Sequence, residues 1–280
     1  MTGIQAMIIN ANGNHSQIKK ATEVRNMLKR LAALLLCFSI VWSFSACGGG
    51  NEPKNQAGEG KLQVSVTFDA MKEFAAAVGK DKVEISTIIP DGMEPHDFEP
   101  KAQDLAALSG SDVFVYSGLG MEAWAEEAVT AADNKDLVTV EASKGADAIR
   151  NTDPEEIEEH GQYDPHIWLS LKGAIFEVKN IKDGFVQADP ANKDYYEKNC
   201  DDFVAQLEAL FSEYDGKFQS AAKKSFVTGH AAFGYLCRDF GLEQNSVEDT
   251  FAAGEPSAQQ LTKLVEYCKE NQVTTIFAEE

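Results

Sequence analysis

The sequence predicts an α/β protein with two lobes, each built around a parallel sheet, and a long helix between them. A strand-like segment at 62–68 is followed by an amphipathic run at 70–78 and a β-branched strand at 83–89, which is the pattern of a parallel α/β unit. A second unit starts with a strand at 225–228, and the intervening residues 191–220 keep helical periodicity with a single glycine. A chain of 280 residues is long enough for two domains of about 100–200 residues each.

Further segments complete the prediction for both lobes. The first lobe is expected to contain a helix over 102–108, a strand at 112–116, a helix that holds Trp124, a short strand at 138–140 and a helix over 169–186. The second is expected to contain a helix ending at 239–241, a strand at 242–247, a helix from Ser257 to about 271 and a strand at 273–278. Ser257 with Gln260 three residues later is a capping-box signature for the last helix.

Three histidines at the ends of strand-like runs, His96, His166 and His230, are predicted to form one metal site. Neutral imidazole is the commonest protein ligand for zinc, and three such ligands leave one position for an acid, a water molecule or another residue. Because the histidines are 70 and 64 residues apart, the tertiary fold must bring them together. His96 follows the strand at 83–89, and open α/β sheets bind ligands beyond the carboxyl ends of their strands.

Acidic residues near His96 are candidates for orienting its ring, and an ordinary role as loop acids is the alternative for each. The candidates are Glu94, Asp97 and Glu99. A fourth histidine, His160, lies in the acidic segment 153–160. Two interpretations of that segment remain: a loop that captures metal ions loosely, or an ordinary solvated acidic loop.

The residues around the three histidines resemble a known family. The stretches at 92–100 (GMEPHDFEP), 163–170 (YDPHIWLS) and 227–242 (VTGHAAFGYLCRDFGL) look like those of the zinc and manganese substrate-binding lipoproteins of ABC importers, in the same order and at similar distances. The resemblance runs from about Leu62 to the last residue. It implies two lobes joined by one rigid helix, with the metal site in the cleft between the lobes and the three histidines as ligands.

The resemblance also implies a function and a partner. Such a protein captures a transition-metal ion outside the cytoplasm and delivers it to the permease of an ABC importer, so a monomer without enzymatic activity is expected. Manganese-type relatives tend to carry a carboxylate where this chain has His230, and oxygen ligands suit manganese. Zn²⁺ is therefore the expected ion, with Mn²⁺ as the alternative.

The same resemblance divides the chain into an N-terminal lobe at 62–189, a connecting helix at 190–221 and a C-terminal lobe at 222–280. A lobe as short as the C-terminal one buries little surface, so its stability would be marginal. Relatives imply further strands, a terminal helix and an acidic ligand after Glu280. The C-terminal lobe is therefore expected to be incomplete, with exposed apolar surface and a three-histidine site open on one side.

The N-terminal segment 1–47 has the pattern of a signal peptide. Lys29 and Arg30 precede an apolar run at 31–44 that is too short to span a bilayer. The small residues before Cys47 resemble the bacterial lipobox, although Phe44 replaces the more usual aliphatic residue. Cys47 is therefore the expected lipid attachment site, which would anchor the protein to the outer face of the bacterial cell membrane. A plain secretory signal is the alternative.

Two features flank this signal. Met27 could be the true start, in which case residues 1–26 are not translated. Residues 48–61 are polar, contain several glycines and show no periodicity, so a flexible tether is expected there.

The composition and the absence of certain catalytic motifs argue against some classes of function. A net charge of −20 argues against a nucleic-acid partner, because such receptors are usually basic. The sequence contains no H-E-x-x-H and no G-x-S-x-G. A secreted zinc hydrolase using the same histidines and a metal-binding adhesin are the alternatives to the metal receptor.

Three cysteines, Cys200, Cys237 and Cys268, follow the signal peptide. Outside the cytoplasm a disulfide can form, and Cys237 with Cys268 is the first choice because both belong to the last lobe. Three buried free thiols are the alternative.

Overall fold

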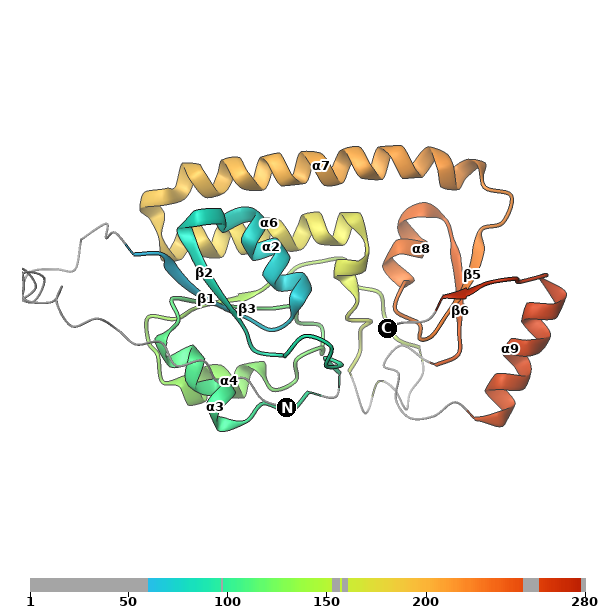
Figure 1. The fold of residues 1–280 in the computed structure, drawn as a ribbon, viewed down its shortest axis with the longest axis horizontal. Coiled ribbons are helices and arrows are strands. Elements are labelled where there is room, and N and C mark those ends of the chain that lie inside the picture. The colour runs from blue at the N-terminus through green and yellow to red at the C-terminus, as the bar shows by residue number, and fades with distance from the viewer. Residues whose placement is uncertain (1–59, 97, 153–156, 158–160, 249–256, 278–280) are drawn as a thin grey trace, which may run out of the picture. The chain divides into compact units, whose positions relative to one another are not determined.

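The computed structural model describes residues 60–96, 98–152, 157, 161–248 and 257–277 (Figure 1). All of them belong to the compact unit Ala57–Glu280, and the other unit is Met1–Gln56. The predicted signal peptide with Cys47, and the tether up to residue 59, lie outside the described residues. Among the described residues, no helix combines the length and the apolar character that crossing a bilayer requires.

The first lobe is built from strands and helices that alternate along the chain. Its main elements are β1 (Leu62–Val66), α2 (Asp69–Gly79), β2 (Val83–Thr87), α3 (Ala102–Ala106), β3 (Val113–Tyr116), α4 (Ala125–Ala132), β4 (Val138–Glu141) and α6 (Leu171–Ala188). The second lobe contains β5 (Ser225–Thr228), α8 (Gly234–Phe240), β6 (Glu243–Ser246), α9 (Ala258–Glu270) and β7 (Ile276–Phe277). The helix between the lobes is α7 (Lys193–Ser220).

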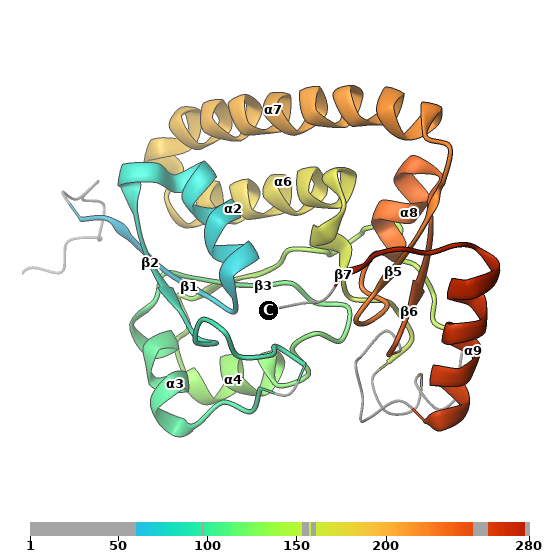
Figure 2. The same cartoon turned by 45° about the vertical axis from the view of Figure 1, so that its right-hand side comes forward.

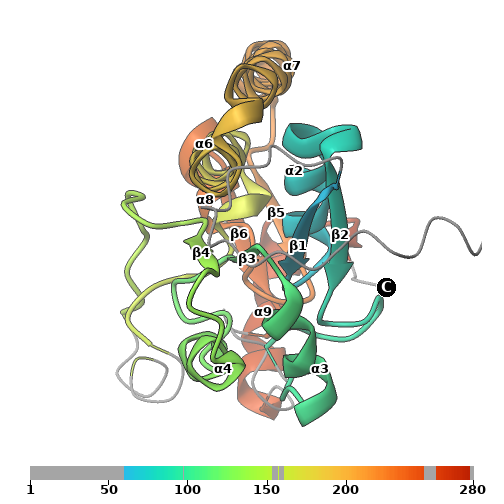
Figure 3. The ribbon, with the colours of Figure 1, turned by 90° about the vertical axis from the view of Figure 1, so that its left-hand side faces the viewer.

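The first sheet is parallel, with the strand order β2-β1-β3-β4. Val64 of the central strand β1 lies opposite both Ile85 and Val113. Helices α2 and α6 cover one face of this sheet and α3 and α4 the other (Figure 3). From β1 the chain crosses to β2 on one side, and from β2 it crosses back over β1 to β3 on the other side. Because both crossovers are right-handed, a change of direction along the sheet places the connecting helices on opposite faces. The strand order therefore reverses between β1 and β3, where sheets of this kind bind ligands beyond the carboxyl ends of their strands.

The second sheet is also parallel, with the order β6-β5-β7. The step from β5 to β6 and the return to β7 run in opposite directions, so α8 and α9 lie on opposite faces (Figures 1 and 2). Cys237 is on α8 and Cys268 on α9, and both are free thiols, as is Cys200. The preferred disulfide between Cys237 and Cys268 is therefore wrong, because the sheet separates the two helices.

Helix α7 has 28 residues and packs on both lobes (Figure 1). Its first half is buried against the first lobe, where the Asn199 side chain donates to the carbonyl oxygen of Val78 at 2.9 Å. Its second half presents Phe211 and Phe218 to Phe240 of α8, with ring centroids 4.8 and 4.9 Å apart. These contacts confirm the predicted architecture of two parallel α/β lobes joined by one long helix.

The end of the second lobe departs from the prediction in the length of its last strand. Of the strand expected at 273–278, the described residues 273–277 form a strand only at Ile276–Phe277, and α9 contributes no buried side chain. The large apolar side chains exposed there are Leu261, Val265, Ile276 and Phe277, at 41–57% exposure. The lobe thus carries the apolar surface that the sequence predicts, and the expected continuation beyond Glu280 stays a prediction.

Two buried glutamates lie at the carboxyl ends of β1 and β3. Glu122 accepts hydrogen bonds from the Thr67 hydroxyl and from the backbone N–H groups of Ser117 and Gly118, at 2.6–3.0 Å. Glu177 of α6 accepts only from the Ser117 hydroxyl, at 3.3 Å, and its Oε2 is buried without a partner. Burial raises the pKa of Glu177 well above its usual value, because desolvation disfavours the charged carboxylate.

We expect Glu177→Gln to stabilise the protein increasingly as the pH rises. In the wild type, the unfolded chain releases this proton above the usual glutamate pKa of about 4.3, whereas the raised pKa makes the folded protein release it only at a higher pH, so wild-type stability falls as the pH rises above about 4.3. Glutamine carries no such proton. Urea unfolding at pH 4, 6 and 8 should give a difference in unfolding free energy that grows with pH, whereas a constant difference would mean that Glu177 ionises within the fold.

Candidate metal centre

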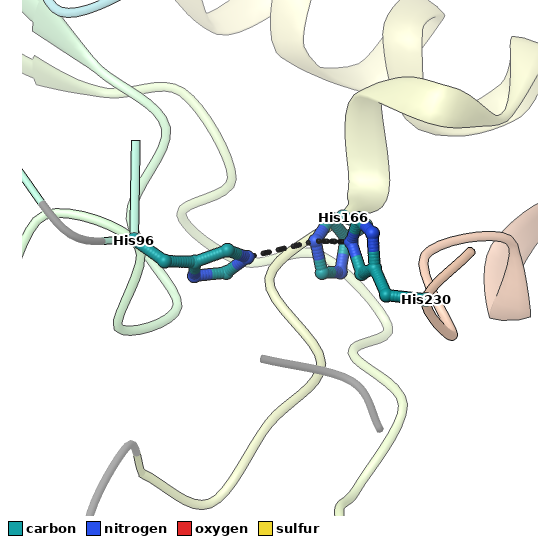
Figure 4. A group of neighbouring side chains, drawn as sticks. All are labelled: His96, His166 and His230. Carbon is teal, nitrogen blue, oxygen red and sulfur yellow. Dashed lines mark hydrogen bonds between the residues drawn. The ribbon is translucent and has the colours of Figure 1, made fainter. Parts of the chain in front are cut away.

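The three predicted histidines come together between the two lobes (Figure 4). The Nε2 atom of His166 lies 3.0 Å from Nε2 of His96 and 3.3 Å from Nε2 of His230. One nitrogen from each ring can be chosen so that all three lie within 4.8 Å of one another. In the described part of the chain, this is the only group of at least three histidine, cysteine or acidic side chains with that geometry.

His96 is carried by the loop that follows β2, as predicted from the strand-end position. Phe98 anchors this loop because its ring is 8% exposed and packs edge-on against Trp124, with centroids 5.8 Å apart. The Phe98 N–H also donates to the carbonyl oxygen of Pro95 at 3.4 Å. The buried ring therefore fixes the half-buried His96 close to the other two histidines.

His230 follows β5 in the corresponding way in the second lobe. Its side chain is 7% exposed, and its carbonyl oxygen accepts a hydrogen bond from the Thr228 hydroxyl at 2.7 Å. The carbonyl oxygen of the preceding Gly229 accepts from the N–H groups of Val247 and Glu248 at 3.0 and 2.9 Å. These bonds hold the turn that carries His230 against the end of β6.

His166 does not end a strand, so this part of the sequence prediction is wrong. It lies in a loop immediately before the short 3-10 helix Ile167–Leu169, and its side chain is only 2% exposed. Asp164 holds it in place, because Oδ1 of this carboxylate accepts from both the backbone N–H and ring Nδ1 of His166, each at 2.9 Å. A proton on Nδ1 leaves the lone pair of Nε2 free to face the other histidines.

The geometry and chemistry of the three nitrogens fit a transition-metal ion. Tetrahedral zinc, with Zn–N bonds of about 2.0–2.1 Å, keeps two nitrogen ligands about 3.3 Å apart. The two separations from His166 Nε2, 3.0 and 3.3 Å, are close to that value. Because all three donors are imidazole nitrogens, the group suits zinc better than the oxygen-preferring manganese ion.

The His166 ring is oriented by Asp164, which is not one of the acids considered near His96. The Glu94 carboxylate accepts only from the backbone N–H of His96 at 3.4 Å, Glu99 is exposed, and Asp97 lies outside the described residues. Asp164 was missed, although the Asp-Pro-His order places its carboxylate two residues before the ring that it contacts. His160 and nearly all of the acidic segment 153–160 also lie outside the described residues.

We expect Asp164→Ala to weaken zinc binding by about 10–100-fold, the range typical of a lost carboxylate partner to a ligating histidine. The variant leaves Nδ1 of the buried His166 without its acceptor. Glu94→Ala is the matched control and should stay within about twofold of the wild type, because Glu94 contacts backbone rather than a ring. Competition with a zinc chelator measures both, and equal losses in the two variants would contradict the assignment.

Comparisons with known proteins show the family of this chain. The family model described as "Zinc-uptake complex component A periplasmic" matches residues 64–280. The chain is 40% identical over 260 residues to a putative metal-binding protein of Treponema pallidum, covering 90% of this chain and 82% of that protein. It is 39% identical over 266 residues to the high-affinity zinc uptake system protein ZnuA of Bacillus subtilis, covering 91% and 82%.

A solved structure of a related protein also resembles this chain. The metal-dependent lipoprotein YcdH from Bacillus subtilis aligns with a TM-score of 0.67 at 42% identity, over 79% of each chain. Two parallel α/β lobes, a connecting helix and three histidines drawn from both lobes fit a solute-binding protein, and the matching family is one of solute-binding proteins rather than enzymes. This chain belongs to the periplasmic component A family of zinc-uptake complexes. The alternative of a secreted zinc hydrolase is therefore set aside.

Proposed function

We propose that this protein captures Zn²⁺ outside the cytoplasm and delivers it to the permease of an ABC importer. The observation that carries the proposal is the convergence of His96, His166 and His230, which place one nitrogen from each ring within 4.8 Å of the other two. The names of the relatives support zinc as the ion, since one is a zinc-uptake protein and the family is that of a zinc-uptake component. His96, His166 and His230 are the proposed ligands.

The proposed ion is Zn²⁺ rather than Mn²⁺. Three imidazole nitrogens form a softer ligand set than the carboxylates and carbonyls that suit manganese. No described carboxylate belongs to the group. Competition between the two ions for the purified protein should therefore favour zinc strongly.

The proposed mode of binding follows from the positions of the ligands. His96 and His166 belong to the first lobe and His230 to the second, so one ion bound by all three would link the lobes. Helix α7 packs on both lobes, which favours small lobe movements over a wide opening. The proposed partner is the membrane permease, approached by a monomer of this chain.

Uptake of zinc by cells tests the function. A deletion strain should take up little ⁶⁵Zn from medium with scarce zinc, and the wild-type gene should restore uptake while a gene encoding His166→Ala should not. Manganese uptake in the same strains is the control and should stay unchanged. Normal zinc uptake in the deletion strain would overturn the proposal and favour an adhesin or structural role, with metal binding incidental.

The proposed attachment to the membrane is through a lipid on Cys47, which lies outside the described residues. We expect Cys47→Ser to move the protein from the membrane fraction to the soluble exported fraction, because one acylated cysteine is the only anchor that the sequence indicates. Cell fractionation followed by immunoblotting measures this. An unchanged membrane association would contradict the lipid anchor while leaving zinc binding intact.

A further inference from the structure

Tyr235 of α8 belongs to the second lobe, but its hydroxyl group bonds to the backbone of the first. The side chain is fully buried. Its hydroxyl donates to the carbonyl oxygen of Asp164 at 2.6 Å and accepts from the N–H of Ile149 at 3.2 Å. Desolvation by burial raises the pKa of Tyr235 to about 12, so the hydroxyl keeps the proton that it donates.

The two backbone groups that Tyr235 bridges belong to a short antiparallel pairing. The Asp164 N–H donates to the carbonyl oxygen of Ile149 at 2.9 Å, Arg150 pairs with Tyr163, and the Asn151 N–H donates to Gln162 at 3.0 Å. The remaining groups at the end of this pairing, the Ile149 N–H and the Asp164 carbonyl, meet through the Tyr235 hydroxyl. A residue of the second lobe therefore completes the hydrogen bonding at the point where the first lobe carries Asp164.

Asp164 in turn sets the orientation of His166. Its Oδ1 accepts from ring Nδ1 at 2.9 Å, while a Cβ added at Gly234, the neighbour of Tyr235, would lie only 2.8 Å from its Oδ2. Both the backbone and the carboxylate of Asp164 are thus in contact with the start of α8. The path from the second lobe to the metal centre runs from Tyr235 through Asp164 to His166, with a hydrogen bond at each step.

A second contact holds α8 against the same part of the first lobe. The Arg238 guanidinium donates to the carbonyl oxygen of Asp147 at 2.7 Å, and its Cζ lies 5.0 Å from the centre of the Tyr235 ring. Arg238 therefore fixes α8 beside the segment that begins the antiparallel pairing. Because Arg238 is partly exposed and Tyr235 is buried, the tyrosine is the better defined of the two contacts.

We propose that Tyr235 is a positioning residue that couples the contact between the lobes to the orientation of His166. The inference rests on the proposed zinc site. When the second lobe is in place, the Tyr235 hydroxyl fixes the Asp164 backbone, and the Asp164 carboxylate then holds the His166 ring with Nε2 directed toward His96 and His230. When the second lobe moves away, the ring loses this support, so the metal centre is ordered only while the lobes are in contact.

Removal of the single hydroxyl tests the inference. Tyr235→Phe keeps the buried ring and deletes the bridge between Ile149 and Asp164. Tyr196→Phe is the matched control, because Tyr196 is also fully buried and its hydroxyl also bonds to an aspartate, Asp189, at 2.9 Å, near the start of α7. We expect both variants to lower the melting temperature of the metal-free protein, and only Tyr235→Phe to weaken zinc binding, by about tenfold or more.

A second pair of variants covers the case in which Tyr235→Phe does not fold. Gly234→Ala adds a methyl group against the Asp164 carboxylate at a helical position, so zinc affinity should fall although the helix is not weakened. Gly216→Ala, also within a helix and with no atom within 4 Å of the added Cβ, should leave zinc affinity unchanged. The visible absorption bands of bound Co²⁺, which report the arrangement of the ligands, should change in Tyr235→Phe and Gly234→Ala and remain as in the wild type in both controls.

The outcomes separate this inference from the proposed function. If His166→Ala loses zinc while Tyr235→Phe and Gly234→Ala keep the wild-type affinity and Co²⁺ spectrum, the positioning role is overturned and the zinc site stands. If His166→Ala binds zinc as the wild type does, the zinc site itself is wrong. Equal losses of zinc affinity in Tyr235→Phe and Tyr196→Phe would mean that Tyr235 contributes only to general stability. That result would also overturn the inference.

Discussion

Replacing His166 by alanine is expected to weaken zinc binding by more than about 100-fold, beyond the ~10–100-fold typical of losing an outer partner of a ligand. Its Nε2 lies within 3.3 Å of Nε2 of both other histidines, so it is the nitrogen that links the group. The ring is also held by a buried carboxylate, that of Asp164. Chelator competition on the purified variant measures the loss.

The other histidines provide the comparison for this result. His96→Ala and His230→Ala should also weaken binding strongly, because each removes one of three nitrogen donors. His160→Ala should have a minor effect, since the acidic segment is a secondary candidate. A larger effect of His160→Ala than of His230→Ala would show that the third ligand has been assigned wrongly. The melting temperature of each metal-free variant checks that the fold persists.

Replacing Phe185 by alanine is expected to lower the free energy of unfolding by about 3–5 kcal/mol, the usual cost of removing a buried phenylalanine ring. Phe185 of α6 is fully buried and packs edge-on against Tyr196 of α7, with ring centroids 5.5 Å apart. Whole domains are commonly stable by only about 5–15 kcal/mol, so this is a large fraction of the total. Urea unfolding followed by circular dichroism measures it.

A surface position on α7 gives the control for this variant. Leu210 is 42% exposed, and Leu210→Ala should change the unfolding free energy by no more than about 0.5 kcal/mol. If Phe185→Ala costs less than about 1 kcal/mol, the packing of α6 against α7 contributes little. The view of α7 as a rigid connection between the lobes would then need another basis.

Strand periodicity predicted where two of the three proposed ligands lie in the fold, for a physical reason. Residues 83–89 and 225–228 are rich in β-branched and aromatic side chains, and parallel strands place the loops that follow them at the same edge of a sheet. His96 and His230 follow such strands in the structure. His166 lies beside the other two histidines, but the local reason for its position was wrong, since its loop is held by hydrogen bonds and not by a strand.

Contacts between distant residues were not predictable from the sequence. The Tyr235 hydroxyl meets Ile149 and Asp164, which are 86 and 71 residues away along the chain, and no periodicity marks such a pair. Sequence proximity suggested Glu94, Asp97 and Glu99 as acids that could orient the His96 ring, and it did not indicate that Asp164 contacts the His166 ring. Proximity along the chain also favoured the pairing of Cys237 with Cys268, which the intervening sheet prevents.

Diffraction at the zinc absorption edge from crystals of the zinc-loaded protein tests the central claim most directly. The account predicts one strong anomalous peak between the lobes, with Nε2 of His96, His166 and His230 each about 2.0–2.1 Å away. A peak held by the acidic segment 153–160, or one bound by fewer than these three histidines, would contradict it.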